Sequence, residues 1–106
     1  MYEVKSSHRL ISSKEVETWI AEITSANILE VEVGTNGLQG GDTGHGCRTY
    51  FSIKDLGSTD ISASLIKDKS GDTEGFAVEL GGDCELETFI EALKFAVKVL
   101  EEQKDR

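Results

Sequence analysis

The sequence predicts an α+β fold, a two-layer sandwich in which an antiparallel sheet of about four to five strands carries two helices on one face. Two segments place apolar residues at helical spacing, and the segments between them alternate apolar with polar residues. Short connections join those alternating segments, which favours an antiparallel meander over parallel strands. The chain has 106 residues and shows no linker or internal repeat, so we expect residues 1–106 to form a single domain.

The N-terminal quarter predicts a short strand followed by a helix. Tyr2 and Val4 alternate with charged residues, and Ser12 precedes Glu15 at the spacing of a capping box. One helical stripe then carries apolar residues at i, i+3, i+4 and i+7, namely Val16, Trp19, Ile20 and Ile23. We therefore expect a helix over about residues 13–25, with Trp19 buried.

The middle of the chain predicts four more strands, because apolar and polar residues alternate there with period two. The expected strands are residues 28–33, 48–53, 61–66 and 76–80. Residues 55–60 are expected to form a turn, and residues 67–75 a polar hairpin loop.

The last segment predicts a long helix over about residues 84–102, with Asp83 as its N-cap and acids in its first turn. A continuous apolar stripe follows this helix, consisting of Leu86, Phe89, Ile90, Leu93, Val97 and Leu100. We expect this stripe to face the sheet and to bury Phe89. Phe95 and Val99 lie off it and either broaden the apolar face or leave part of it for a partner.

Composition and charge exclude several classes of protein. The chain carries 20 acidic and 11 basic residues, a formal charge of −9, with four basic and ten acidic residues in 71–106. Such a charge argues against direct binding of nucleic acid, because a phosphate-binding face needs Lys and Arg. No apolar run spans a membrane and no leader segment is recognisable, so we expect a cytoplasmic protein without a membrane partner. The acidic surface serves solubility, captures a basic partner or mimics nucleic acid.

Candidate functional residues gather in a loop, because residues 34–46 contain six glycines and cannot form a regular element. Residues 41–46 have the glycine spacing of a phosphate-binding loop, but Cys47 and Arg48 replace its Lys and Ser/Thr. A less regular loop whose backbone N–H groups bind a small anion, with Arg48 at its edge, is a further alternative. The triplet Asp42-Thr43-Gly44 matches retroviral-type aspartic proteases, although the flanking hydrophobic strand is missing.

Metal binding and thiol chemistry are further alternatives. Asp42, His45 and Cys47 are close in sequence, but zinc sites usually need two paired ligands. Cys84 is either a small buried residue or, in the first turn of a helix, a thiol of lowered pKa. We expect no catalytic residues, no metal and no cofactor, and both cysteines as free thiols.

The remaining interpretations treat the loop as purely structural or as a recognition loop. A long loop in a compact domain is seldom without function. We place the partner-binding or ligand-binding site on five residues, Leu38, Gln39, Asp42, His45 and Arg48. Asp42, His45 and Arg48 are expected to lie near one another at one end of the sheet.

Two segments, residues 40–53 and 81–90, resemble small uncharacterised proteins of bacterial phages and mobile elements, and they cover about a quarter of the chain. The size and charge are similar to those of phage inhibitors of bacterial defence, including anti-CRISPR proteins. This resemblance implies a non-catalytic acidic binding protein that inhibits a nucleic-acid-handling complex through a basic protein partner. The alternative is a small-ligand or nucleotide-binding protein, or a minor enzyme, that uses the loop of residues 34–47. No oligomeric state follows from the sequence.

Overall fold

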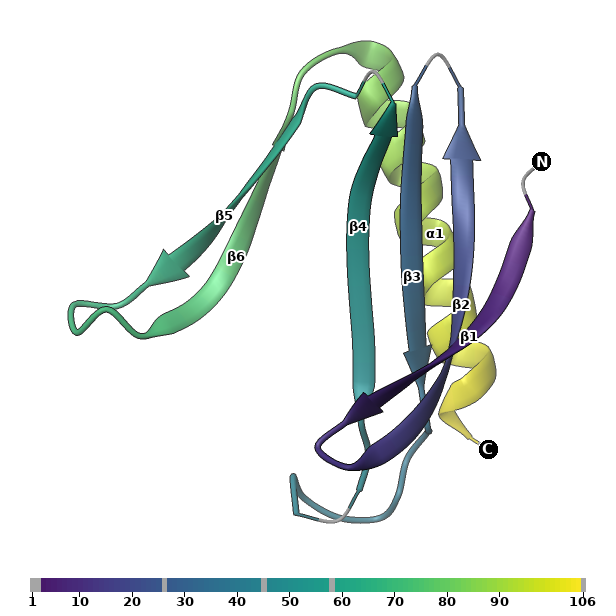
Figure 1. The fold of residues 1–106 in the computed structure, drawn as a ribbon, viewed down its shortest axis with the longest axis vertical. Coiled ribbons are helices and arrows are strands. Elements are labelled where there is room, and N and C mark those ends of the chain that lie inside the picture. The colour runs from purple at the N-terminus through teal and green to yellow at the C-terminus, as the bar shows by residue number, and fades with distance from the viewer. Residues whose placement is uncertain (1–2, 26, 45, 58, 106) are drawn as a thin grey trace.

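The structure is a computed structural model, and it describes residues 3–25, 27–44, 46–57 and 59–105. Its elements in chain order are β1 (Val4–Ile11), β2 (Lys14–Thr24), β3 (Ile28–Thr35), β4 (Thr49–Gly57), β5 (Ile61–Lys67), β6 (Thr73–Leu80) and α1 (Asp83–Lys104). Figure 1 shows the sheet of β1 to β4, with α1 behind it and β5 and β6 projecting to one side.

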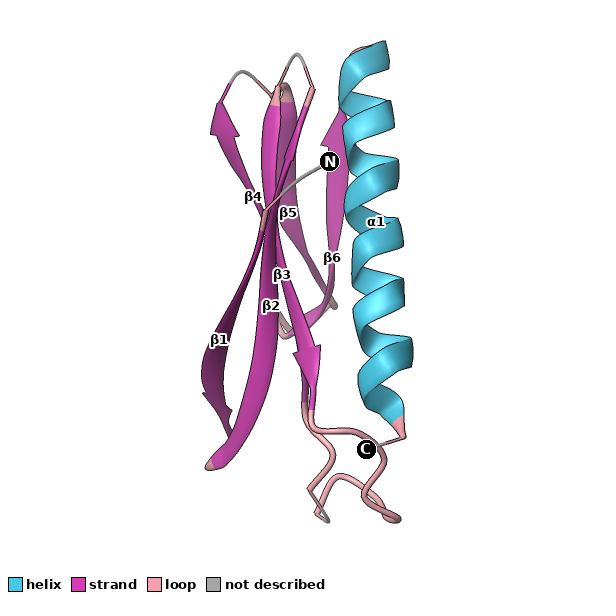
Figure 2. Cartoon of the chain, turned by 90° about the vertical axis from the view of Figure 1, so that its right-hand side faces the viewer, coloured by secondary structure: helices cyan, strands magenta, loops and turns pink. Residues whose placement is uncertain are grey.

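The fold is mostly β. The described residues form a four-stranded antiparallel sheet in the order β1-β2-β3-β4, a separate β5-β6 hairpin and one helix. The expected single sheet covered by two helices is therefore wrong. Helix α1 covers one face of the sheet and packs chiefly on β3 and β2, as the side view in Figure 2 shows. The antiparallel connectivity expected for consecutive strands is confirmed.

The helix expected over residues 13–25 is a strand, β2. Ser12 and Ser13 have φ values of 50° and 68°, the left-handed conformation that both central residues of a type I′ hairpin turn adopt. Ser12 therefore belongs to a turn between β1 and β2 and caps no helix. Pairing of Ile11 with Lys14 closes this hairpin, and β1 runs antiparallel to β2 back to Val4.

Strand β2 buries different faces along its length. In its first half Val16 and Thr18 are buried, whereas in its second half Ala21 and Ile23 are buried against α1. Trp19, which we expected to be buried, is only half-buried at the edge of the core. The buried residues therefore change from even-numbered to odd-numbered positions within β2. This change gives the apolar residues a spacing that resembles that of an amphipathic helix.

Helix α1 is rotated relative to the expected orientation. Its core-facing side consists of Thr88, Ala92, Phe95, Ala96, Val99 and Gln103. Phe95 and Val99 pack on Ala21, Val31 and Val33, while Phe89 is only half-buried. Of the apolar stripe that was expected to face the sheet, Leu86, Ile90, Leu93 and Val97 are exposed, whereas Leu100 packs at the edge of the core. The helix begins one residue earlier than expected, with Gly82 as its N-cap and no side-chain cap bond from Asp83.

The four strands predicted from alternating apolar and polar residues are present as β3, β4, β5 and β6, and each is longer than expected. Strand β4 continues through residues 55–57, which were expected to start a turn. Strand β6 begins at Thr73, so the hairpin loop is shorter than residues 67–75.

The β5-β6 hairpin, which we call the arm, departs from the end of the sheet where β4 ends and α1 begins (Figure 1). Its two connections are tied together because Gly81 N–H donates to Asp60 O at 3.0 Å. The radius of gyration is 15.2 Å, against about 13 Å for a compact chain of this length. The arm therefore extends from the body of the molecule and does not fold over it.

Candidate functional site

The loop of residues 36–48 connects β3 to β4 at the end of the sheet beside the C-terminal end of α1 (Figure 2). Asn36 holds its two ends together: Asn36 Nδ2 donates to Gly46 O at 2.6 Å, and Arg48 N–H donates to Asn36 Oδ1 at 2.8 Å. Asn36 N–H also donates to Arg48 O at 3.2 Å. The base of the loop is therefore fixed like a continuation of the β3-β4 ladder.

The helix end fastens the same loop from the other side. Leu38 N–H donates to Lys104 O at 2.8 Å, which satisfies one of the carbonyls that a helix leaves free at its C-terminus. Gly37 has φ of +87°, and a Cβ there would lie 2.9 Å from the carbonyl oxygens of Gln103 and Lys104. Only glycine fits this close approach of loop to helix.

The buried Gln103 side chain joins the helix to two strands. Its Oε1 accepts from Thr35 N–H at 3.0 Å, and its Nε2 donates to Glu17 O at 3.1 Å. Gln103 is 1% exposed, so these bonds satisfy an amide that has left water. The position of the loop relative to α1 is therefore set by buried hydrogen bonds.

A groove of about 220 Å³ lies between the loop and the helix end. Its lining residues are Thr35, Gly37, Leu38, Cys47, Thr49, Leu100, Glu101 and Lys104. Leu38 is 64% exposed although its backbone is bonded to the helix, so an apolar side chain is held in solvent at the mouth of the groove. Glu101 and Lys104 add one acidic and one basic side chain to this lining.

The other predicted site residues occupy the same loop. Gln39 is exposed and donates from Nε2 to Asn36 O at 2.9 Å. Asp42 is exposed at the tip, where its Oδ1 accepts from Gly44 N–H at 2.9 Å in an Asx turn. Arg48 is half-buried at the base and donates from its guanidinium to Cys47 O at 2.9 Å. His45 lies outside the described residues, so the expected proximity of the three polar side chains stays a prediction.

Among the described residues, the structure adds no observation that favours thiol or metal chemistry. Both cysteines are free, as expected; Cys47 is half-buried in the groove, and Cys84 is exposed in the first turn of α1 and is not a buried residue. Within the part of the chain that the structure describes, no three His, Cys, Asp or Glu residues are grouped to hold a metal ion.

A charged cluster that the sequence did not reveal lies on the sheet face opposite α1. Arg9 donates to both carboxylate oxygens of Glu32, at 2.9 and 2.7 Å, and Thr18 Oγ1 donates to Glu32 at 2.7 Å. The Arg9 guanidinium stacks 4.5 Å above the centroid of the Tyr50 ring. Glu32 is 3% exposed, and its bond to Arg9, followed by that to Thr18, lowers the pKa of its carboxyl group. Because every member is partnered, the cluster fastens β1 across the sheet and offers no free reactive group.

Sequence reasoning also missed two exposed apolar surfaces. The first, the α1 stripe, consists of Leu86, Ile90, Leu93 and Val97, which are 40–57% exposed. The second lies on the arm, where Leu65 and Phe76 are 62% and 61% exposed. The sequence does contain a signal for the first surface. Phe95 and Val99 lie off the regular stripe and form a second one, and a helix with two apolar stripes can leave one of them uncovered.

Comparison of the chain with protein-family models, with curated proteins and with solved structures found no match. Among the described residues, no helix combines the length and apolar character needed to cross a membrane.

Proposed function

We propose that this chain is a non-catalytic binding protein that recognises a basic protein partner through the loop of residues 36–48 and the groove beside it. The observation that carries the proposal is the exposed Leu38 side chain on a backbone bonded to the end of α1. An exposed leucine on a free loop would lose much conformational entropy on binding. Here the hydrogen bonds of the folded chain have already ordered the backbone, which leaves more of the contact energy for affinity.

The groove favours a side chain of a protein partner over a small ligand. Its volume of about 220 Å³ is below the range of roughly 300–1,000 Å³ typical of sites for drug-sized ligands. Leu38 and Leu100 provide apolar contact, and Glu101 provides a charge at the rim. Such an arrangement suits an apolar anchor residue flanked by a basic one.

The net charge supports a basic partner. With a charge of −9, the protein attracts cationic surfaces over distances up to about one Debye length, which is about 30 Å at 0.01 M salt and about 8 Å at 0.15 M. Inhibition of a nucleic-acid-handling complex is the finer form of this proposal, since such complexes present basic surfaces to the phosphate backbone.

The experiment compares Leu38→Asp with Leu10→Asp, a matched control on β1 in which an equally apolar, 76% exposed side chain that does not line the groove is changed. Proteins captured on the immobilised chain are purified one at a time, and the affinity of each for the three chains is measured. A basic partner should lose at least tenfold in affinity, about 1.4 kcal/mol, with Leu38→Asp and little with Leu10→Asp.

Binding by the parent chain should also weaken as salt is raised. The proposal is wrong if each purified partner binds Leu38→Asp as tightly as the parent chain, or if its affinity is insensitive to salt. Melting temperatures of all three chains show whether any loss reflects unfolding.

A further inference from the structure

The arm carries one fully apolar face. In the β5-β6 ladder Leu65 pairs with Phe76, Ala63 with Val78 and Ile61 with Leu80, and paired residues of an antiparallel ladder lie on the same face. The outer pair of this face, Leu65 and Phe76, is more than 60% exposed. A two-stranded hairpin on its own is marginally stable in water, because it needs a further layer on its apolar face. The arm therefore lacks a covering layer.

The α1 stripe also lacks a covering layer. Leu86 and Val97 mark its ends, 11 residues apart, which corresponds to about 16 Å of helix. The apolar face of the arm extends over four residue steps, or about 14 Å of strand. The two surfaces match in length and in chemistry, and a helix packed on strands is a standard two-layer arrangement.

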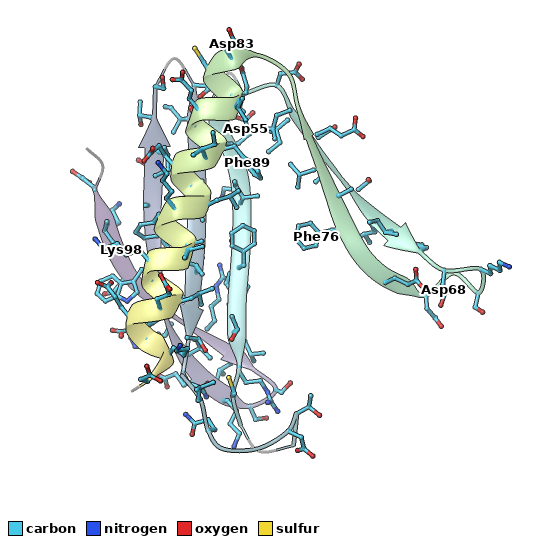
Figure 3. The ribbon with its side chains drawn as sticks, turned by 180° about the vertical axis from the view of Figure 1, so that it is seen from behind. Asp55, Asp68, Phe76, Asp83, Phe89 and Lys98 are labelled. Carbon is cyan, nitrogen blue, oxygen red and sulfur yellow. The ribbon has the colours of Figure 1, made fainter. Side chains whose placement is uncertain are left out.

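Within one chain these surfaces do not cover each other, since the large side chains of both remain exposed. Figure 3 shows Phe76 projecting from the arm toward the side on which β4 and α1 lie, with the arm standing away from the body. Because Phe76 is 61% exposed, a helix from outside can contact it on that side. Because each chain offers both an arm and a stripe, a two-fold arrangement of two chains can cover all four surfaces at once.

We propose that two copies of this chain form a dimer in which the arm of each copy packs on the α1 stripe of the other. The area agrees with this occupant. A standard interface buries about 1,600 Å² in total, so each of the four surfaces must supply about 400 Å². On α1 the four half-exposed side chains of the stripe provide this surface. On the arm, Leu65 and Phe76 provide most of it, together with the half-buried Ile61, Val78 and Leu80.

Charge sets how the dimer responds to salt. Each copy carries −9, so the two copies repel each other, and screening should strengthen self-association. Binding of a basic protein on the same surfaces would weaken under the same change. The salt dependence therefore separates a second copy from a basic partner seated between arm and helix.

The experiment is sedimentation equilibrium of the full chain over a range of protein and salt concentrations. The parent chain should show twice the chain mass, with a dissociation constant that falls as salt is raised. Phe76→Asp on the arm and Leu93→Asp on α1 should each sediment as a single chain, because each change removes both arm-stripe contacts of a symmetric dimer. Leu10→Asp, on an exposed β1 position outside both surfaces, should keep the two-chain mass.

An equimolar mixture of Phe76→Asp and Leu93→Asp provides the decisive result. One arm-stripe contact between unlike chains stays intact, so the mixture should regain a two-chain species that neither variant forms alone. A parent chain that stays single at all concentrations and salts overturns the proposal. The proposal is also overturned if the mixture forms no two-chain species, which would mean that the arm folds on the helix of its own chain. Circular dichroism checks the fold, and Phe76→Ser and Leu93→Ser replace any variant that unfolds.

Discussion

Replacing Phe95 and Phe89 with alanine, one at a time, tests the orientation of α1 directly. Phe95 is 5% exposed and packs among Ala21, Val31 and Val33, whereas Phe89 is half-buried at the margin of the core. Truncation of an enclosed phenylalanine removes its transfer free energy and leaves a cavity, at a cost of about 3–5 kcal/mol. We expect that loss for Phe95→Ala and roughly half of it or less for Phe89→Ala, because solvent already reaches Phe89.

Urea denaturation measures both variants against the parent chain. A domain of this size has a total unfolding free energy of about 5–15 kcal/mol and a urea slope of about 1–3 kcal/mol per molar. A loss of about 4 kcal/mol then lowers the midpoint by about 2 M. Measurements at protein concentrations low enough to keep the chains single exclude any contribution from association. A larger loss for Phe89→Ala than for Phe95→Ala would refute the observed rotation of the helix.

Two further predictions concern buried polar contacts. Because its partners lower the pKa of Glu32, this carboxylate adds stability that is complete above its unfolded pKa of about 4.3 and is lost as pH falls through the lower folded value. The difference in unfolding free energy between the parent chain and Glu32→Gln should therefore shrink in acid, and a constant difference down to the lowest pH would contradict this. Gln103→Ala should cost about 1–3 kcal/mol for each buried group left unpaired. Faster hydrogen exchange of the Thr35 amide measures this loss, with the exposed Glu102→Ala as control, and unchanged exchange would argue against the bond.

The sequence located most strands because alternation with period two survives wherever one face is buried. It failed at β2 because that strand buries Val16 and Thr18 on one face and then Ala21 and Ile23 on the other. The resulting spacing imitates a helix. The β-branched and aromatic composition of residues 16–24 favours a strand, and this signal should have outweighed the periodicity.

Helix α1 was located well, but its orientation was predicted wrongly. A helix with two apolar stripes does not reveal which stripe meets the sheet. In this protein the stripe with the small residues meets the sheet, because Ala92 and Ala96 let the helix approach β3 closely, beside Phe95 and Val99. For the site, the glycine-rich composition located the loop, although Gly34 and Thr35, which were expected to belong to it, form the end of β3. The fastening of the loop by Asn36 and Gln103 depends on pairings between distant segments, which local patterns do not contain.

The order of the elements has a consequence during protein synthesis. The four strands of the sheet leave the ribosome before α1, and each pairs with its neighbour along the chain, so the ladder can form early. Its apolar inner face then has no cover until residues 92–99 emerge, 35 to 42 residues after the end of β4. During that interval Val31, Val33 and Ile53 are open to chaperones and to other nascent chains.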